Sequence, residues 1–315
     1  IGIGGAGYAA GDTAGTAVGL TMITGFPRPV VVALVGAAVF GLLATGRYRV
    51  VERVLGVLVA IMSAVFLLAA ILARPDLAEL VTGMLRPTVP DGALLTTIAL
   101  VGTTIVPYNL FLHASIVQEK WPTADRAALR QARRDTVLSL SAGGLITLAI
   151  ATTAGATLFT RGIQADSAAA LAEPLRPALG PVAEPVLALG LFSAGLTSAV
   201  AGPFGAAYAI TSVLGWSTDL SSPRFKAVWM AVVCVGVAIA LTGTDPVALI
   251  VVAQAANGLL LPGVAVFLLV VMNRTSILGE HRNRLAGNLA GAVVVLVVTV
   301  LGLYQFADVL GVLPG

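Results

Sequence analysis

Long apolar stretches separated by short polar segments run through the whole sequence. They fall at about 1–24, 29–46, 51–73, 92–116, 136–160, 184–214, 226–243, 246–272 and 285–307. A helix needs about 20 mostly apolar residues to cross the hydrocarbon core of a bilayer, and these stretches meet or approach that length. The pattern predicts an all-α membrane protein with nine transmembrane helices that form one transmembrane domain over residues 1–315.

The composition agrees with this class. Of 315 residues 58% are hydrophobic and 10% are charged, whereas an ordinary soluble domain carries about 25% charged residues. We therefore expect the lipid bilayer to be the main surrounding of the chain. The single cysteine, Cys234, lies in an apolar stretch, which excludes a disulfide framework and Cys-ligated zinc. Nothing indicates nucleic acid as a partner, and the oligomeric state cannot be read from the sequence.

The basic residues predict the orientation. If successive helices alternate in direction, the connections after the second, fourth, sixth and eighth stretches share one side of the membrane and hold 13 of the 18 Lys and Arg residues; the other side holds 5. The positive-inside rule places the richer side in the cytoplasm. The N-terminal end is then cytoplasmic and the C-terminus outside. The excess of Arg over Lys, with abundant Ala and Gly, is typical of a GC-rich bacterial genome, so we expect a bacterial plasma (inner) membrane.

The first stretch carries a glycine ridge and one acid. Gly7, Gly11, Gly15 and Gly19 recur every four residues on one helix face, which allows another helix backbone to approach closely. Asp12 is the only carboxylate well inside a predicted span. Acids at that depth are rare and usually serve proton or cation passage.

The fourth stretch is expected to be a broken helix. Pro107 has no N–H and cannot complete the helical hydrogen bond to the carbonyl of Thr103. Interrupted helices that expose carbonyls near the midplane are how secondary transporters bind ions. Asn109 and His113 lie four residues apart and share one face of the second half-helix. A plain proline kink is the alternative interpretation.

Two later stretches also contain polar residues. The eighth holds Gln254, Asn257 and Pro262, whose side-chain oxygens and weakened helix suit a hard cation, although helix–helix hydrogen bonding would use the same residues. The small hydroxyl residues around Ser193 in the sixth are typical of packing. No metalloprotease helix, nucleophile elbow or phosphate loop is present, so we do not expect an enzyme.

Three segments resemble one family of transporters. Gly102-Thr-Thr-Ile-Val-Pro-Tyr-Asn-Leu-Phe-Leu-His-Ala-Ser115 is similar to the sixth membrane helix of the Nramp (natural resistance-associated macrophage protein) family, proton-linked divalent metal transporters with the LeuT fold. The segments 191–202 and 253–262 resemble the family's eighth and tenth helices. The resemblance implies a LeuT-like (APC-type) helical bundle in which the nine stretches are family helices three to eleven. We therefore expect an N-terminally truncated transporter domain without the family's first two helices.

The resemblance also implies roles for individual residues. The carbonyl of Thr103 matches the family's backbone metal ligand, and Gln254 matches a residue that approaches the metal, with Asn257 beside it in support. Asp12 and His113 fall on residues of the proton pathway. Pro107 and Tyr108 occupy the helix break, and Asn109 is expected to line the same metal site.

Several positions depart from the family pattern. Val106 stands where the family has a metal-binding methionine, Tyr108 replaces a histidine, and Ala9 replaces a second acid of the proton route. A thioether favours softer transition metals, whereas a site with oxygen ligands alone suits magnesium. The metal preference is therefore expected to differ from that of standard members.

The leading hypothesis is a secondary active transporter of divalent metal cations, magnesium or manganese among them, with proton coupling through Asp12 and His113 and no cofactor besides its metal substrate. One alternative is a LeuT-fold carrier of another solute or a monovalent cation, suggested by Val106 and Tyr108. Another is a transport-inactive membrane scaffold, suggested by the two absent helices.

Overall fold

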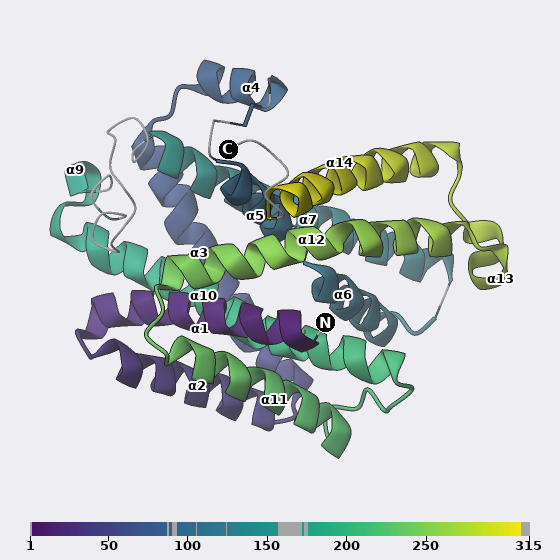
Figure 1. Cartoon of the computed structure of the whole chain (residues 1–315), viewed down its shortest axis with the longest axis horizontal. Helices are drawn as coiled ribbons and strands as arrows, with labels where there is room; N and C mark the ends of the chain where they lie inside the picture. Colours follow the sequence, from purple (N-terminus) through teal and green to yellow (C-terminus); the bar gives the residue numbers. More distant parts are fainter. Residues whose placement is uncertain are drawn as a thin grey trace.

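The structure, a computed structural model, is entirely helical in the part that it describes, residues 2–86, 88–89, 93–104, 106–123, 125–156, 172 and 176–309. Most of the longer helices lie roughly along the horizontal of the view, whereas the helix of residues 48–73 runs steeply across them (Figure 1). In chain order the elements are α1 (Gly2–Thr24), α2 (Arg28–Ala44), α3 (Tyr48–Ala73), α4 (Leu77–Leu85), α5 (Leu94–Thr104), α6 (Pro107–Lys120), α7 (Arg126–Ala154), α9 (Arg176–Leu179), η3 (Gly180–Val182), α10 (Ala183–Val213), α11 (Pro223–Ala240), α12 (Pro246–Asn273), α13 (Thr275–Leu278), η4 (Gly279–His281) and α14 (Leu285–Val309).

Proline and aspartate set many of the helix starts. Proline lies in the first turn of α2, α6, α11 and α12, where its missing N–H removes no helical hydrogen bond. The carboxylates of Asp76, Asp125 and Asp245 accept backbone N–H groups at the starts of α4, α7 and α12. At Asp125 the hydrogen bonds from Ala128 and Ala127 hold the pKa of the carboxyl below its usual value.

Among the described residues six helices are long and apolar enough to cross a membrane, or seven if α1 and α2, which meet at a bend of 116°, count as one span. The sequence predicted nine. The difference lies at two places: α1 and α2 were predicted as separate spans, and α5 and α6 are each too short to qualify alone because the helix is interrupted between them. The chain is a multi-pass membrane protein on either count.

Some helix boundaries in the structure differ from those predicted from the sequence. The fifth span was placed at 136–160, but α7 already begins at Arg126, and residues 157–160 lie outside the described part. The added turns are polar, so the apolar pattern did not reveal them. The amphipathic helix α4 was not predicted, because its nine residues are too short for a span and its pattern was assigned to a connection.

The largest buried cluster joins α1, α2, α3, α10 and α11. Within it Phe204, Tyr208 and Phe225 pack edge to face with ring centroids 5.0 to 5.7 Å apart, and Trp229 meets Phe40 in the same way at 5.1 Å. Such aromatic pairs add about 0.5–1.5 kcal/mol each beyond their burial. This cluster fixes α10 and α11 against α1.

Helix α1 lies in very close contact with α10. A Cβ atom added to Gly19 would lie 2.5 Å from the backbone nitrogen of Phe192 and 2.6 Å from the carbonyl oxygen of Ala188. One added to Gly195 of α10 would lie 2.5 Å from Oγ1 of Thr16. The two backbones can approach this closely only because both positions lack a side chain.

The same helix also packs on α12 and α11. Gly11 and Gly15 both face Ile250 of α12, and Gly236 of α11 faces Ala9, where an added Cβ would lie 2.6 Å from the Ala9 Cβ. The predicted glycine ridge is therefore divided between two partners, α10 at Gly19 and α12 at Gly11 and Gly15. Helix α1 is thus held on three sides by small residues.

We predict that Gly19→Ala destabilises the protein by about 1–3 kcal/mol, the usual cost of overpacking a tight contact, because its methyl group meets backbone that cannot rotate away. Gly7→Ala is the matched control on the same helix, since nothing lies within 4 Å of a Cβ there. Thermal unfolding of the detergent-purified variants should show a lower midpoint for Gly19→Ala alone. Equal midpoints would contradict the packing described here.

Candidate functional site

The predicted helix break is present at Pro107. Helix α5 ends at Thr104 and α6 begins at Pro107, with Val106 extended at its N-cap, φ −90° and ψ 121°. Residue 105 lies outside the described part. The first turn of α6 is closed by the amide of Asn109, which donates to the carbonyl of Val106 at 3.0 Å. The chain therefore changes from one short helix to another within the fourth predicted span.

The break lies where three helices meet. Val106 and Tyr8 of α1 are both 7% exposed and pack against each other, and Ala253 of α12 completes this small cluster. Nearby, α12 packs closely on α5. A Cβ added at Gly258 of α12 would lie 2.8 Å from Cγ2 of Ile98 on α5. The broken helix is thus enclosed by α1 on one side and α12 on another.

A hydrogen bond joins α1 to α12 beside this cluster. The hydroxyl of Tyr8 donates to Oε1 of Gln254 at 2.8 Å, although the two residues lie 246 positions apart. Asn257, one turn further along α12, is 2% exposed and also interacts with the Tyr8 hydroxyl. Its Nδ2 has no hydrogen-bond partner of good geometry in the described part of the chain. Predicted residues Gln254 and Asn257 therefore gather around a tyrosine that the prediction had not included.

Asp12 lies one helical turn after Tyr8 on the same face of α1. Its Oδ2 atom is enclosed by protein, and no hydrogen bond reaches it from any described residue. Its backbone carbonyl is engaged separately, by Oγ1 of Thr16 at 2.6 Å. An enclosed carboxylate oxygen without a partner costs free energy, so Asp12 is a candidate for binding a cation or a proton.

The polar side chains on either side of the break, on α5 and α6, are exposed. The side chains of Thr103 and Asn109 are exposed, and Asn109 makes no side-chain hydrogen bond in the described part of the chain. His113 is exposed too, and its Nε2 lies 3.3 Å from Oγ1 of Thr136 on α7. The side chains of Pro107 and Tyr108 lie outside the described part. The structure thus gathers Gln254, Asn257, Asp12 and Val106 around Tyr8, whereas in the described part of the chain the side chains of Asn109 and His113 form no hydrogen bond with any of them.

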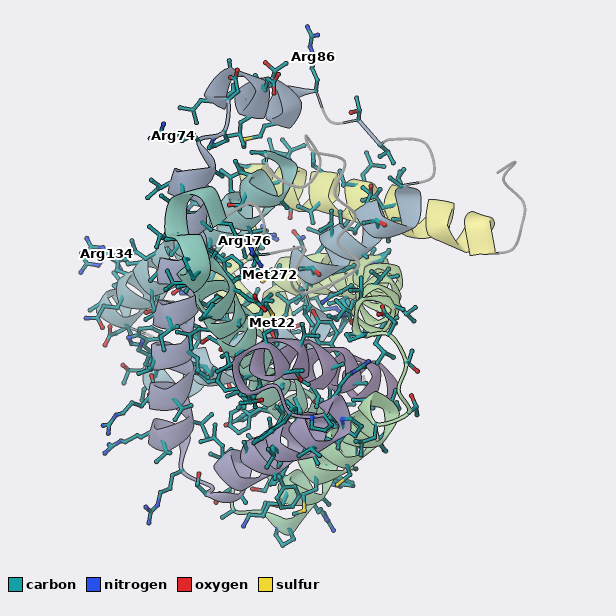
Figure 2. All side chains as sticks on the ribbon, turned by 90° about the vertical axis from the view of Figure 1, so that its left-hand side faces the viewer. Met22, Arg74, Arg86, Arg134, Arg176 and Met272 are labelled. Carbon is teal, nitrogen blue, oxygen red and sulfur yellow. The ribbon has the colours of Figure 1, made fainter. Side chains whose placement is uncertain are left out.

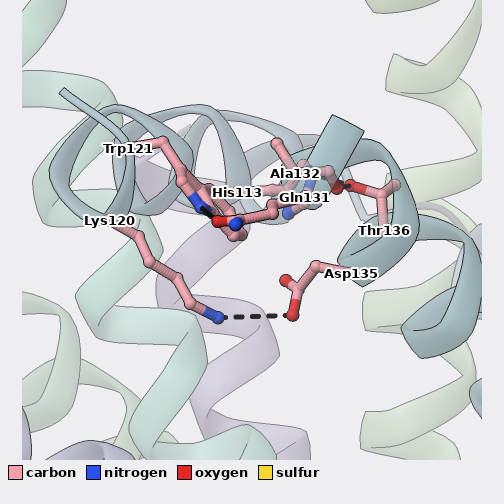
Figure 3. Close-up of polar contacts among 7 residues, drawn as sticks. All are labelled: His113, Lys120, Trp121, Gln131, Ala132, Asp135 and Thr136. Carbon is pink, nitrogen blue, oxygen red and sulfur yellow. Dashed lines mark hydrogen bonds and ion pairs between the residues drawn. The ribbon is translucent and has the colours of Figure 1, made fainter. Parts of the chain in front are cut away.

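Helix α6 is instead tied to α7 by polar side chains (Figure 3). Nζ of Lys120 lies 3.2 Å from Oδ1 of Asp135, and Nε1 of Trp121 donates to Oε1 of Gln131 at 3.2 Å. Together with the contact between His113 and Thr136, these two side-chain pairs join α6 to the first turns of α7. Exposed pairs of this kind contribute little to stability, so the packing of α6 on α10, where Leu112 contacts the largest buried cluster, holds it more than its contacts with α7 do.

Tyr8 is the residue that sequence reasoning missed. Its position four residues before Asp12 places both on one face of α1, and that spacing could have revealed it. What the spacing could not show is that this face meets Gln254. Ser193, which the sequence suggested for packing alone, is fully buried, and its Oγ has no partner among the described residues.

The chemistry of the site is that of oxygen ligands. Among the described residues no three His, Cys, Asp or Glu side chains lie close enough together to hold a metal ion. The oxygen-bearing side chains gathered around Tyr8 are the Tyr8 hydroxyl itself, the Gln254 amide and, one helical turn along α1, the Asp12 carboxylate. Such hard oxygen donors suit magnesium, calcium or manganese better than softer metals.

Known proteins are similar to this chain over nearly its whole length. The family model described as "Natural resistance-associated macrophage protein-like" (Nramp) matches residues 3–308. The divalent metal cation transporter MntH of Deinococcus radiodurans is 25% identical over 304 residues, covering 94% of this chain and 69% of the relative. The MntH protein of Yersinia pestis is 26% identical over 302 residues and 72% of its own length. The natural resistance-associated macrophage protein 2 homolog of Dictyostelium discoideum is also 26% identical, over 48% of its length.

Solved structures agree on the fold. A crystal structure of the Eremococcus coleocola manganese transporter, in complex with an aromatic bis-isothiourea substituted compound, superposes with a TM-score of 0.71. It is 22% identical and covers 98% of this chain and 70% of that chain. At this identity the likeness establishes the fold alone, and it confirms the LeuT-type bundle that the sequence predicted. The match of the family model over residues 3–308 goes further: the chain belongs to the Nramp family, whose members are membrane transporters and not enzymes.

Proposed function

We propose that this protein is a secondary active transporter of divalent metal cations and that the cation binds where α1, α12 and the α5–α6 break meet. The observation that carries the proposal is the enclosed, unpartnered carboxylate oxygen of Asp12 beside the Tyr8–Gln254 hydrogen bond. The names of the MntH relatives support the class of substrate.

The proposed site combines an acid with neutral oxygens. Asp12 supplies the negative charge, Gln254 an amide oxygen and Thr103 the backbone carbonyl that Pro107 leaves free. Asn109 is proposed to join this set when α6 moves, since its side chain is exposed in the present state.

Protons are proposed to share the route. Asp12 is the only acid of the proposed site, so a proton and a cation would compete for its carboxylate, and such competition can couple the two fluxes. His113 is proposed to pass protons between this site and the surface on which its ring is exposed.

The membrane arrangement is proposed to follow the basic residues. Counting α1 and α2 as two spans and α5 with α6 as one gives nine among the helices that the structure describes: α1, α2, α3, α5–α6, α7, α10, α11, α12 and α14. With the N-terminal end in the cytoplasm, 13 of the 18 basic residues lie inside. We propose a bacterial plasma membrane as the location, as the MntH relatives suggest.

We predict that Asp12→Asn lowers manganese uptake into proteoliposomes by about tenfold or more, because removing the charge leaves the cation only neutral ligands; a tenfold change corresponds to about 1.4 kcal/mol. The matched control is Glu52→Gln, which removes the same charge from an exposed position on α3 and should transport normally. Normal uptake by Asp12→Asn would remove the proposed site. Failure of the unaltered protein to take up any divalent cation would instead favour the transport-inactive scaffold.

We predict that Val106→Met shifts the metal preference toward softer ions and raises the ratio of manganese to magnesium uptake at least severalfold, since the thioether joins the oxygen ligands. Val106→Leu enlarges the same buried position without sulfur and is the control for altered packing. Competition between the two metals in one uptake assay gives the ratio directly. The assignment fails if the methionine and leucine variants have the same ratio.

A further inference from the structure

Three arginines at the start of α7 form a basic surface apart from the proposed transport site. Arg130, Arg133 and Arg134 are all exposed, and their spacing of three and four residues places them on one face of the helix. None of the three forms an ion pair in the described part of the chain. Asp135 follows directly in the sequence, but its carboxylate pairs with Lys120. Arg134 extends away from the body of the molecule (Figure 2).

The opposite face of these turns is already occupied. Gln131, Asp135 and Thr136 contact Trp121, Lys120 and His113 of α6. At about 100° per residue, the three arginines are directed roughly opposite to the residues that hold α6. The arginine face therefore does not serve the contact between α6 and α7.

The arginines lie at the height of lipid headgroups. Helix α7 has 29 residues and is therefore about 43 Å long at 1.5 Å per residue, whereas a hydrocarbon core is about 30 Å thick. Its apolar part begins after Asp135, and about 20 residues from there suffice to cross the core. The polar first turns then lie in the interface, with the arginines directly beside the hydrocarbon boundary.

Apolar surface continues from the arginines into the membrane. Val137 and Leu138 are 55% and 70% exposed and lie one turn further along the same face. Together with the three arginines they line an open hollow of about 480 Å³. The hollow thus has cationic groups at one end and branched apolar side chains at the other.

We propose that this hollow, the α7 arginine site, binds an anionic phospholipid. Arginine guanidinium groups pair with phosphate oxygens through two parallel hydrogen bonds, and clustered basic residues beside a membrane helix favour anionic lipids. The lipid phosphate lies between Arg130, Arg133 and Arg134, and the upper part of an acyl chain lies along Val137 and Leu138. Both ends of the site are needed, which distinguishes a phospholipid from a free phosphate ion.

The experiment measures lipid binding to the purified protein in detergent by native mass spectrometry, with phosphatidylglycerol and phosphatidylcholine as probes. The triple variant R130Q/R133Q/R134Q is compared with R274Q/R282Q/R284Q, which loses the same charge from the connection between α12 and α14. We expect the first variant to bind phosphatidylglycerol at least tenfold more weakly and the second to bind it within about twofold of the unaltered protein. Phosphatidylcholine binding should differ little among the three.

Two results would overturn the proposal. One is equal loss of phosphatidylglycerol binding in both triple variants, which would mean that net charge alone attracts the lipid. The other is full displacement of phosphatidylglycerol by an equal concentration of glycerol 3-phosphate, which would mean that the site binds the phosphate group and that the acyl chain contributes nothing. Because the test requires no transport, its outcome is independent of the proposed metal uptake.

Discussion

The close approach of α1 to α10, α11 and α12 is the constraint on which the rest of the structure depends. In a bilayer, apolar side chains gain little by meeting each other rather than lipid, so helices associate through tight packing and polar contacts. Here glycines supply the tight packing: Gly19 admits the backbone of α10, Gly236 admits Ala9, and Gly11 lies against Ile250. This packing fixes the rotation of α1 about its axis and therefore decides where Tyr8 and Asp12 point.

The site follows from that rotation. With α1 fixed, Tyr8 reaches Gln254 of α12 and packs on Val106 at the helix break. One turn away, the Oδ2 atom of Asp12 is enclosed and has no hydrogen-bond partner among the described residues. Two helices that are held rigidly thus present a carboxylate, a hydroxyl and an amide to a third that is interrupted. Helix α6 is held differently from α1: it packs on α10, where Leu112 contacts the largest buried cluster, and exposed polar side chains join it to α7.

Much of this was predictable from the sequence, and the reasons differ from residue to residue. Pro107 predicted the break correctly, because a missing N–H is a local chemical fact that no tertiary contact can restore. The family pattern at 102–115 predicted the fold, which the structural likeness and the family model confirm. The bond between Tyr8 and Gln254 was not predictable, because it depends on how two helices 246 residues apart are rotated. The start of α7 was missed since its first turns are helical but polar, and the roles of Asn109 and His113 stay predictions.

The most direct test of the central claim is a double-mutant cycle between Tyr8 and Gln254, with manganese uptake measured for Tyr8→Phe, Gln254→Leu and the double variant. If the hydrogen bond between α1 and α12 shapes the cation site, the second change should add little once the first is made, and the double variant should transport about as well as the poorer single variant. Losses that simply multiply would show that the two residues act independently and would contradict a site built between α1 and α12.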